Sequence, residues 1–403
     1  MDPILAFLQQ HLPDYLADLE ALVNVDCGTD HKPGVDAVGE IMQARLEAIG
    51  CSVTRFPLAD YGDCRLATLQ GSGQVRVLLI GHLDTVYSMG AVAERPLRFE
   101  GDRAVGPGVC DMKAGLLTGL YALKALRATG FDEFAEISFF LNSDEEVGSP
   151  VSRALYAEAA RRADVALVLE AARANGDIVG SRKGGGLYVL TVHGRAAHAG
   201  VEPEKGANAI VELAHQIQGL GGLNGLHPGT TVNPGIVQGG SRTNVVPDLA
   251  RVEVDVRVGT PEAIDPLDQA IRQLAAAPQV AGARVEVEGG IHTPPMPHRP
   301  AIAFLARLAQ AAARDLGFEI GIAHTGGTSD ANYVAESGTP VLDGLGPIGG
   351  LDHSPGEYLD VDSIVPRTAL LARLIQSVCR NRDFIRGVTT TGEAGPNHGR
   401  KPT

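Results

Sequence analysis

The stretch VRVLLIGH (residues 75–82), followed directly by LDTV (83–86), is a nearly unbroken apolar run that ends in polar residues. Runs of this kind, rich in branched side chains, are typical of strands buried on both faces of a parallel or mixed sheet. Two similar runs follow at 136–143 (EISFFLNS) and 164–170 (DVALVLE), and helical patterns lie between the runs. Alternating strands and helices predict an α/β fold with helices packed on a mixed sheet.

The pattern changes near residue 180. After a Gly-rich segment (180–186, GSRKGGG), the stretch LYVLTVHG (187–194) alternates apolar and polar residues with period two. That period is typical of a strand with one solvated face. A helix, two strands, a second helix and a last strand are predicted to follow. This β-α-β-β-α-β order resembles the ferredoxin-like arrangement, so we expect an inserted α+β domain.

These patterns also predict where the domains begin and end. Apolar spacing typical of α/β elements resumes near residue 294, and the last residues of the chain lack such spacing, which is typical of disorder. The predicted segments are 1–179 and 294–386 for the two parts of the α/β domain, 180–293 for the insert and 387–403 for a disordered tail.

Composition and charge exclude several classes of protein. No apolar run approaches the roughly 20 residues of a membrane helix, and the net charge of −14 argues against a nucleic-acid or anionic-membrane partner. The first ten residues contain no basic residue, which argues against a signal peptide. Five cysteines without a CxxC pair are typical of a reducing compartment, so we expect a cytoplasmic location.

Polar clusters that contain metal-binding groups follow the predicted strands. Because ligands gather at the carboxyl ends of strands in α/β sheets, we expect these side chains to converge. Imidazoles and carboxylates together suit zinc, or a similar ion such as cobalt or manganese. The surplus of ligands over one ion indicates two ions bridged by a carboxylate. The clusters contain His82 and Asp84 in GHLDTV, Asp111 in GPGVCDMK, Asp144, Glu145 and Glu146 in NSDEEVGS, Glu170 in LVLEAA, and Asp352, His353 and Glu357 in GGLDHSPGEY.

Each of these residues, taken alone, also has a structural explanation. A histidine at a strand end, such as His82, is more often a hydrogen-bonded structural residue than a ligand. Asp111 lies in a Gly/Pro loop, where aspartate commonly forms a turn or caps a helix. Their joint occurrence after several strands favours the metal site. A site for a single ion stays an alternative.

Seven motifs resemble, in order, those of the zinc aminoacylase and carboxypeptidase family: GHLDTV, GPGVCDMK, NSDEEVGS, LVLE, GRAAHAG, GGTSDAN and DHSPGEY. That family includes glutamate carboxypeptidase, acetylornithine deacetylase and succinyl-diaminopimelate desuccinylase. The resemblance runs from about residue 10 to residue 385. It implies a mixed-sheet dinuclear-zinc peptidase domain with an inserted ferredoxin-like lid and dimerisation domain.

The resemblance also implies a role for each residue of the metal site. It makes Asp84 the residue that orients the imidazole of His82, and Glu145 the general base. It further implies a cis peptide bond between Asp111 and Met112. Two zinc ions per subunit would be held by five ligands, namely His82 and Glu170 on one ion, Glu146 and His353 on the other, and Asp111 as the bridge.

Residues beyond the metal site are implied to bind the substrate. His198 in GRAAHAG would polarise the scissile carbonyl, often in the partner subunit's site, which implies a homodimer through the insert. Read from the residues alone, His198 is equally a surface histidine, Arg257 a solvated strand residue and GGTSDAN an ordinary Gly-rich turn. The remaining candidates for substrate binding are Asn244, Arg257, Gly326, Gly327 and Thr328.

The predicted reaction is hydrolysis of an amide bond in a small peptide or an N-acyl amino acid. The local sequence is most similar to the glutamate carboxypeptidase branch, which removes C-terminal glutamate. Relatives often carry an arginine in the segment that here reads GGIHTPPMP, where this chain has Thr293 preceded by His292. This departure keeps an N-acyl-amino-acid deacylase as the main alternative. A metal-binding relative without activity is a remote one.

Overall fold

The computed structural model describes residues 2–382 and divides into two compact units. Among these residues, unit 1 comprises 2–180, 298–324 and 329–382, and unit 2 comprises Ser181–Pro297 and Thr325–Thr328. Unit 2 extends beyond residue 293 because Met296 pairs with Arg182 through backbone hydrogen bonds. The tail predicted at 387–403 lies outside the described residues. Within residues 2–382, no helix combines the length and apolarity needed to cross a membrane.

Unit 1 contains a six-stranded mixed sheet, as the apolar runs predict. Strands β6, β3, β7 and β14 are parallel neighbours, and β1 and β2 add an antiparallel edge. The three apolar runs of the sequence are therefore the adjacent central strands, buried along almost their whole length. In spatial order the strands are β1 (Ser52–Phe56), β2 (Cys64–Gln70), β6 (Glu136–Asn142), β3 (Arg76–His82), β7 (Val165–Val168) and β14 (Val341–Leu342).

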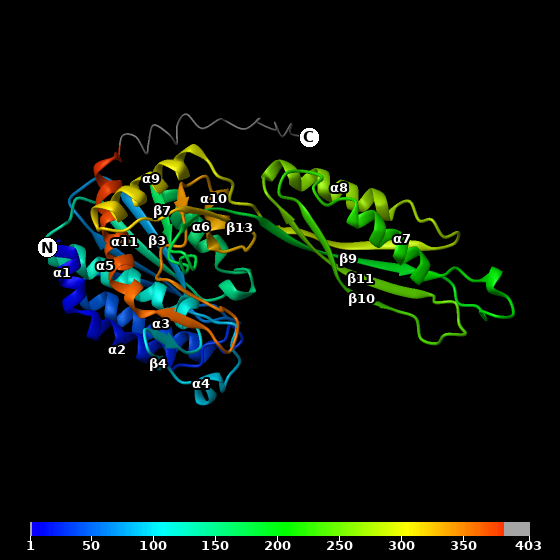
Figure 1. Cartoon of the computed structure of the whole chain (residues 1–403), viewed down its shortest axis with the longest axis horizontal. Coiled ribbons are helices and arrows are strands. Elements are labelled where there is room, and N and C mark those ends of the chain that lie inside the picture. Colours follow the sequence, from blue (N-terminus) through cyan, green and yellow to red (C-terminus); the bar gives the residue numbers. More distant parts are fainter. Residues whose placement is uncertain (1, 383–403) are drawn as a thin grey trace. The chain divides into compact units, whose positions relative to one another are not determined.

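Helices of unit 1 pack on both faces of this sheet (Figure 1). Phe139 and Phe140 are consecutive on β6, so their side chains point to opposite faces. Helix α5 approaches Phe139 at Gly119, and Tyr156 of α6 contacts the ring of Phe140 edge-on. The helices are α1 (Pro3–Gln10), α2 (Leu12–Val23), α3 (Lys32–Ala48), α4 (Ala91–Glu94), α5 (Ala114–Ala128), α6 (Arg153–Arg162), α9 (Pro300–Asp315), α10 (Asp330–Glu336) and α11 (Ile364–Arg380).

Apart from the sheet of unit 2, the described residues form two further, smaller sheets. One has the order β15 (Gly349–Gly350), β16 (Tyr358–Asp360), β5 (Arg103–Val105) and β4 (Arg98–Glu100). Its strands support the loops that follow Val105 and precede Tyr358, because these two residues are register partners. The other sheet pairs β8 (Ile178–Arg182) with β13 (Ile322–Thr325). A boundary between the two units falls within each of these strands.

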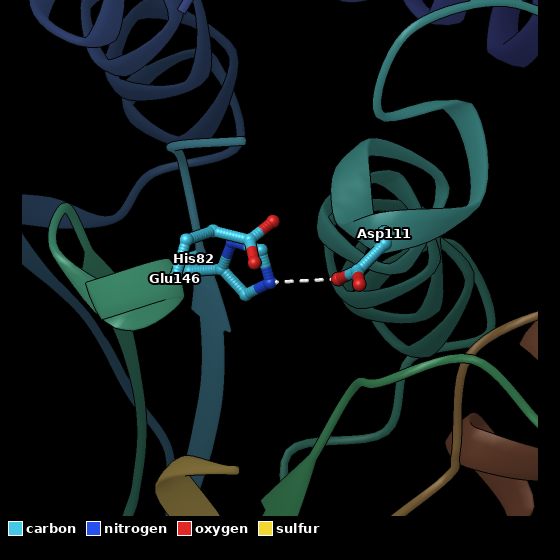
Figure 2. A group of neighbouring side chains, drawn as sticks. All are labelled: His82, Asp111 and Glu146. Atoms are coloured by element: carbon cyan, nitrogen blue, oxygen red, sulfur yellow. Dashed lines mark hydrogen bonds and ion pairs between the residues drawn. The ribbon is translucent and has the colours of Figure 1, made fainter. Parts of the chain in front are cut away.

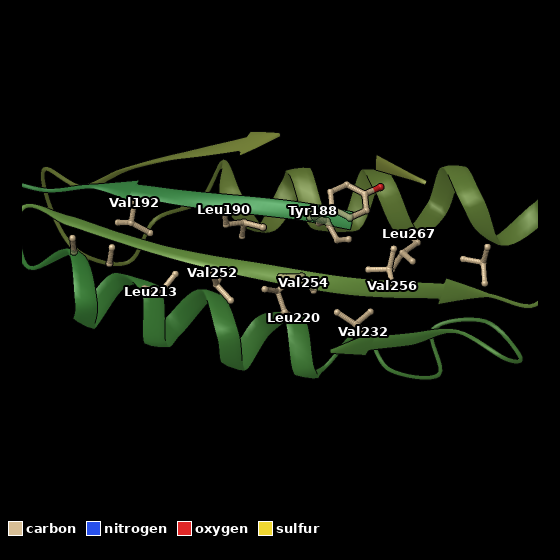
Figure 3. Packing of buried hydrophobic residues seen from close by; sticks show 14 of the residues in the cluster. Tyr188, Leu190, Val192, Leu213, Leu220, Val232, Val252, Val254, Val256 and Leu267 are labelled. Atoms are coloured by element: carbon tan, nitrogen blue, oxygen red, sulfur yellow. The ribbon is translucent and has the colours of Figure 1, made fainter. Parts of the chain in front are cut away.

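Unit 2 is an antiparallel sheet covered by two helices, in the order β-α-β-β-α-β along the chain. Alternating residues of β9 and β11 point to the helices and form its core, which includes Val252, Val254 and Val256 (Figure 3). In spatial order the strands are β10 (Thr231–Gly239), β11 (Leu249–Val258), β9 (Gly184–His193) and β12 (Arg284–Thr293), and the helices are α7 (Ala209–Gly221) and α8 (Ile264–Ala275).

Candidate active site

The predicted metal ligands of unit 1 lie at the carboxyl ends of neighbouring strands. His82 is the last residue of β3, Glu146 lies in a short turn of helix directly after β6, and Glu170 follows β7. Because these strands are parallel, their ends meet at one edge of the sheet. Asp111 precedes α5, and His353 lies between β15 and β16.

The carboxylate of Asp111 lies between two imidazoles. Its Oδ1 is 2.9 Å from Nε2 of His82 (Figure 2), and its Oδ2 is 3.2 Å from Nε2 of His353. Each imidazole has a further carboxylate beside it: Glu170 Oε1 is 3.7 Å from His82, and Glu146 Oε2 is 3.2 Å from His353. The five side chains therefore form two histidine–carboxylate pairs that share one carboxylate.

The chemistry of these side chains fits a divalent cation. Ligand atoms from His82, Asp111 and Glu146 all lie within 4.8 Å of one another. Oε1 of Glu146 is buried and has no hydrogen-bond partner, although a carboxylate oxygen without a partner is costly to bury. Nitrogen and carboxylate ligands in such a group are those that zinc prefers.

The neighbouring carboxylates favour the protonated form of both imidazoles. The hydrogen bonds to Asp111 and Glu146 raise the pKa of His353 to about 10. Burial alone lowers the pKa of His82, but its hydrogen bonds to Asp111 and Asp84 raise that pKa well above 6.5. A metal ligand must be the neutral imidazole, so a cation has to displace these protons.

Asp84 connects His82 to the turn that carries Glu145 and Glu146. Its backbone carbonyl is 2.9 Å from Nδ1 of His82, which leaves Nε2 directed at Asp111. Its carboxylate accepts the backbone N–H groups of Glu145 and Glu146 at 3.3 and 3.2 Å. The closer partner of the imidazole is thus the carbonyl of Asp84, while the carboxylate holds the turn.

Glu145 lies beside Glu146 in a buried, acidic environment. Burial raises its pKa well above the usual value, and the neighbouring carboxylates of Glu170, Asp330 and Glu146 add to the shift. Glu145 and Glu146 are consecutive, and only Glu146 contacts His353. Glu146 is therefore positioned as a candidate ligand beside His353, and the neighbouring Glu145 is left for a different role in the same site.

In unit 2, His198 and Arg257 lie at opposite ends of the sheet. His198 is exposed and lies five residues after His193, the last residue of β9, and the backbone N–H of Ala199 donates to the carbonyl of Asn244. Arg257 pairs in register with Gly185, near the first residue of β9. At about 3.3 Å per residue, the eight steps from Gly185 to His193 span roughly 26 Å.

The GGTSDAN loop lies at the Arg257 end of β9. A side-chain carbon on Gly185 would stand 3.0 Å from the Arg257 guanidinium and 3.5 Å from the methyl group of Thr328. Gly326, Gly327 and Thr328 are all exposed. The N–H of Gly327 donates to Thr325 Oγ1 at 3.3 Å.

Comparison with known proteins shows the family of this chain. The sequence profile of Peptidase family M20/M25/M40 matches residues 78–377. The chain belongs to this family. Carboxypeptidase G2 from Pseudomonas sp. (strain RS-16) is 34% identical over 91% of this chain and 89% of its own length. Acetylornithine deacetylase from Myxococcus xanthus is 30% identical over 92% of this chain and 99% of its own.

Solved structures show the same fold. Aminopeptidase PepT from Bacillus cereus has a TM-score of 0.79 at 23% identity, with 91% of this chain and 98% of that chain covered. A tripeptidase from Staphylococcus aureus has a TM-score of 0.78 at 24% identity, with 92% and 99% covered. The predicted resemblance and the prediction of a hydrolase of this class are confirmed.

Members of the M20 family generally use metal ions, and the cluster around Asp111 is the candidate site in this M20 chain. The peptide bond between Asp111 and Met112 is cis, as the resemblance implies.

Two buried acids lie next to this cluster: Asp330, which was not among the predicted site residues, and Glu357, which the sequence grouped with the possible ligands without a specific role. Asp330, in GGTSDAN, accepts hydrogen bonds from Asn142 and Ser149, and burial raises its pKa to about 6. Glu357, in DHSPGEY, is 1% exposed and contacts the Asp111 loop. Both acids lie inside motifs of the family resemblance, GGTSDAN and DHSPGEY. Their position in these motifs is the sequence signal that could have indicated a role at the site.

Proposed function

We propose that this M20 enzyme hydrolyses the amide bond of an N-acylated amino acid or small peptide, as a glutamate carboxypeptidase does. The observation that supports this proposal is the Asp111 carboxylate between two imidazoles, each with its own second carboxylate. Zinc is the proposed cation, with cobalt or manganese as substitutes. The ligands would be His82 and Glu170 for one ion, Glu146 and His353 for the other, and Asp111 for both.

The proposed chemistry divides the work between cations and side chains. When bound, a pair of divalent ions supplies Lewis acidity, which lowers the pKa of water towards about 7 and polarises a carbonyl. Glu145 takes the proton of the attacking water on its carboxylate and delivers it to the nitrogen of the leaving amine. A carboxyl whose pKa is raised by burial keeps that proton until the nitrogen accepts it.

We further propose that the enzyme is a homodimer through unit 2, the predicted lid domain (180–293). One small substrate cannot contact His198 and Arg257 of the same chain, because the length of β9 separates them. A partner subunit would supply its own His198 to the carbonyl. Strand β10 supports this arrangement, because it is an edge strand with exposed Ile236 and Val237, and α7 exposes Ile210 and Val211 nearby.

Arg257 is the proposed anchor for the carboxylate of the amino-acid product, beside the exposed loop of Gly326, Gly327 and Thr328. Asn244 is proposed to contact the substrate next to His198. Thr293 pairs in register with Gly185 on the other side from Arg257. Because Arg257 and position 293 flank Gly185 on its two neighbouring strands, an arginine at 293 would place a second positively charged side chain beside Arg257. Its absence favours the second candidate, an N-acyl-amino-acid deacylase of the same mechanism that does not select glutamate.

A substrate screen tests the proposal. Dipeptides and N-acyl amino acids that vary in their C-terminal residue are incubated with the enzyme and added zinc or cobalt. Hydrolysis that prefers C-terminal glutamate supports the carboxypeptidase, and hydrolysis of N-acyl amino acids without that preference supports the deacylase. Absence of hydrolysis across the series, with metal bound, would contradict both. The five unpaired cysteines accord with the cytoplasm as the proposed location.

A further inference from the structure

Glu357 is a fully buried acid at which the loop after β5 meets the loop before β16. Its side chain is 1% exposed, and it is not among the proposed metal ligands. Oε1 accepts the backbone N–H groups of Cys110 at 2.8 Å and Asp111 at 3.0 Å. Oε2 accepts the N–H of Gly108 at 3.0 Å. One carboxylate therefore binds three backbone donors of a four-residue segment.

Three of the four backbone N–H groups in residues 108–111 donate to Glu357, and the fourth, that of Val109, donates to the carbonyl of Gly106 at 3.2 Å. Gly108 adopts a left-handed conformation with φ of 69°, and a side-chain carbon there would stand 2.5 Å from the methyl group of Thr85. Asp111 and Met112 depart from helical geometry, so this segment is not stabilised as an ordinary helical turn. Its N–H groups need acceptors, and Glu357 supplies those of three.

A third segment reaches the same carboxylate. The hydroxyl of Tyr87 lies 2.7 Å from Oε2 of Glu357 and 2.8 Å from the carbonyl oxygen of Ser354. Tyr87 follows Asp84 by three residues, and Ser354 follows His353 directly. The segments that carry His82, Asp111 and His353 are thus joined at Glu357 and Tyr87.

We propose that Glu357, with Tyr87, is a positioning residue that holds Asp111 and His353 at the spacing required to bind two cations. This inference rests on the proposed function. Asp111 is the residue that both metal positions share, so a shift of its backbone disturbs both. The hydrogen bond from the Asp111 N–H to Glu357 fixes that backbone directly. Residues that orient metal ligands typically change metal affinity or activity about 10- to 100-fold when they are replaced.

Both oxygens of the Glu357 carboxylate accept hydrogen bonds. Glutamine at position 357 has a single acceptor oxygen, and its amide NH₂ would face backbone donors. Glu357→Gln therefore removes acceptors while it preserves shape. Tyr87→Phe removes one donor and leaves every backbone contact of Glu357 in place.

Unit 2 offers a matched control. Glu212 is also fully buried, and its Oε2 accepts the backbone N–H groups of Gln279 and Val280 at 2.7 Å. Glu212→Gln thus makes the same chemical change in a different unit. It should lower the melting temperature without a change in zinc affinity.

The experiment measures zinc affinity by competition with a chelator, zinc content by elemental analysis, and kcat and KM at saturating zinc. We expect Glu357→Gln to bind zinc about 10- to 100-fold more weakly and to lose kcat with little change in KM. We expect Tyr87→Phe to weaken zinc binding several-fold. Tyr87→Phe decides the matter if Glu357→Gln does not fold.

Two results would overturn the inference alone. One is wild-type zinc affinity in Tyr87→Phe and in any folded Glu357→Gln. The other is an equal loss of affinity in Glu212→Gln, which would show that general destabilisation is the cause. A wild-type enzyme that binds no zinc would instead overturn the proposed function, and the inference with it.

Discussion

The two units hold their candidate residues in opposite ways. In unit 1, four of the five proposed ligands have mostly buried side chains. The five contact one another through Asp111 and the two histidines, and three of them lie at the ends of adjacent strands. In unit 2, His198 and Asn244 are exposed and lie a strand length away from Arg257. The first arrangement is complete within one chain. For the second, we propose that a second copy of the chain completes the site.

Replacement of Glu145 is expected to have the largest effect on kcat. It tests whether the general base of unit 1 is a different residue from the metal ligands. Glu145→Ala should lower kcat by about 10³-fold or more, because the proton acceptor is lost. It should retain bound metal, because Glu146 is the neighbour that contacts His353. Elemental analysis and steady-state kinetics measure both, with exposed Glu158→Ala as the control. Joint loss of metal and activity would show that the roles are wrongly assigned.

Replacement of His198 tests whether unit 2 serves another subunit. His198→Ala should lower kcat by about 10²- to 10³-fold, as the loss of a carbonyl-polarising donor does. The control is His193→Ala, at a half-buried histidine that pairs with Glu286, and it should leave kcat unchanged.

Mixing two inactive variants sharpens this test. Random exchange of subunits between His198→Ala and Glu145→Ala makes half of the dimers mixed. Each mixed dimer has one site with an intact Glu145 and the partner's intact His198, so about a quarter of wild-type activity should return. No recovery after verified exchange would place His198 in the site of its own chain.

The apparent affinity for metal is expected to depend on pH in unit 1. The pKa of His353 is raised to about 10, so below that pH the imidazole is protonated in the metal-free enzyme and must release its proton to bind a cation. Affinity should therefore rise at least tenfold per pH unit between pH 6 and pH 8, and flatten near pH 10. Chelator competition at constant ionic strength measures it. An affinity independent of pH would contradict the proposed role of His353.

The smallest effect is expected for Arg257. Arg257→Gln should raise KM about tenfold or more with a smaller change in kcat, because a charged hydrogen bond contributes roughly 1.5–3 kcal/mol. Arg251→Gln, on the same strand and paired with Glu253, is the control. An unchanged KM would return Arg257 to the role of a solvated strand residue that pairs only with Asp255.

Much of unit 1 could be predicted because the relevant signals are local. An apolar run that ends in His82 indicates both a buried strand and the edge at which that strand ends. The role of Glu357 was not predictable in this way, because its partners Gly108, Cys110 and Asp111 lie almost 250 positions earlier in the chain. Nothing in the local pattern reports which distant N–H groups lack an acceptor.

The sequence by itself indicated the α/β class, the β-α-β-β-α-β insert and the candidate metal ligands, because periodicity and motifs are properties of short stretches of the chain. Only the tertiary structure decided that Asp111 lies between His82 and His353, and that Glu357 holds its backbone. It also decided that His198 and Arg257 are separated by the length of β9. Those facts depend on which strands pair and in what register, and pairing is settled by the burial of the whole chain.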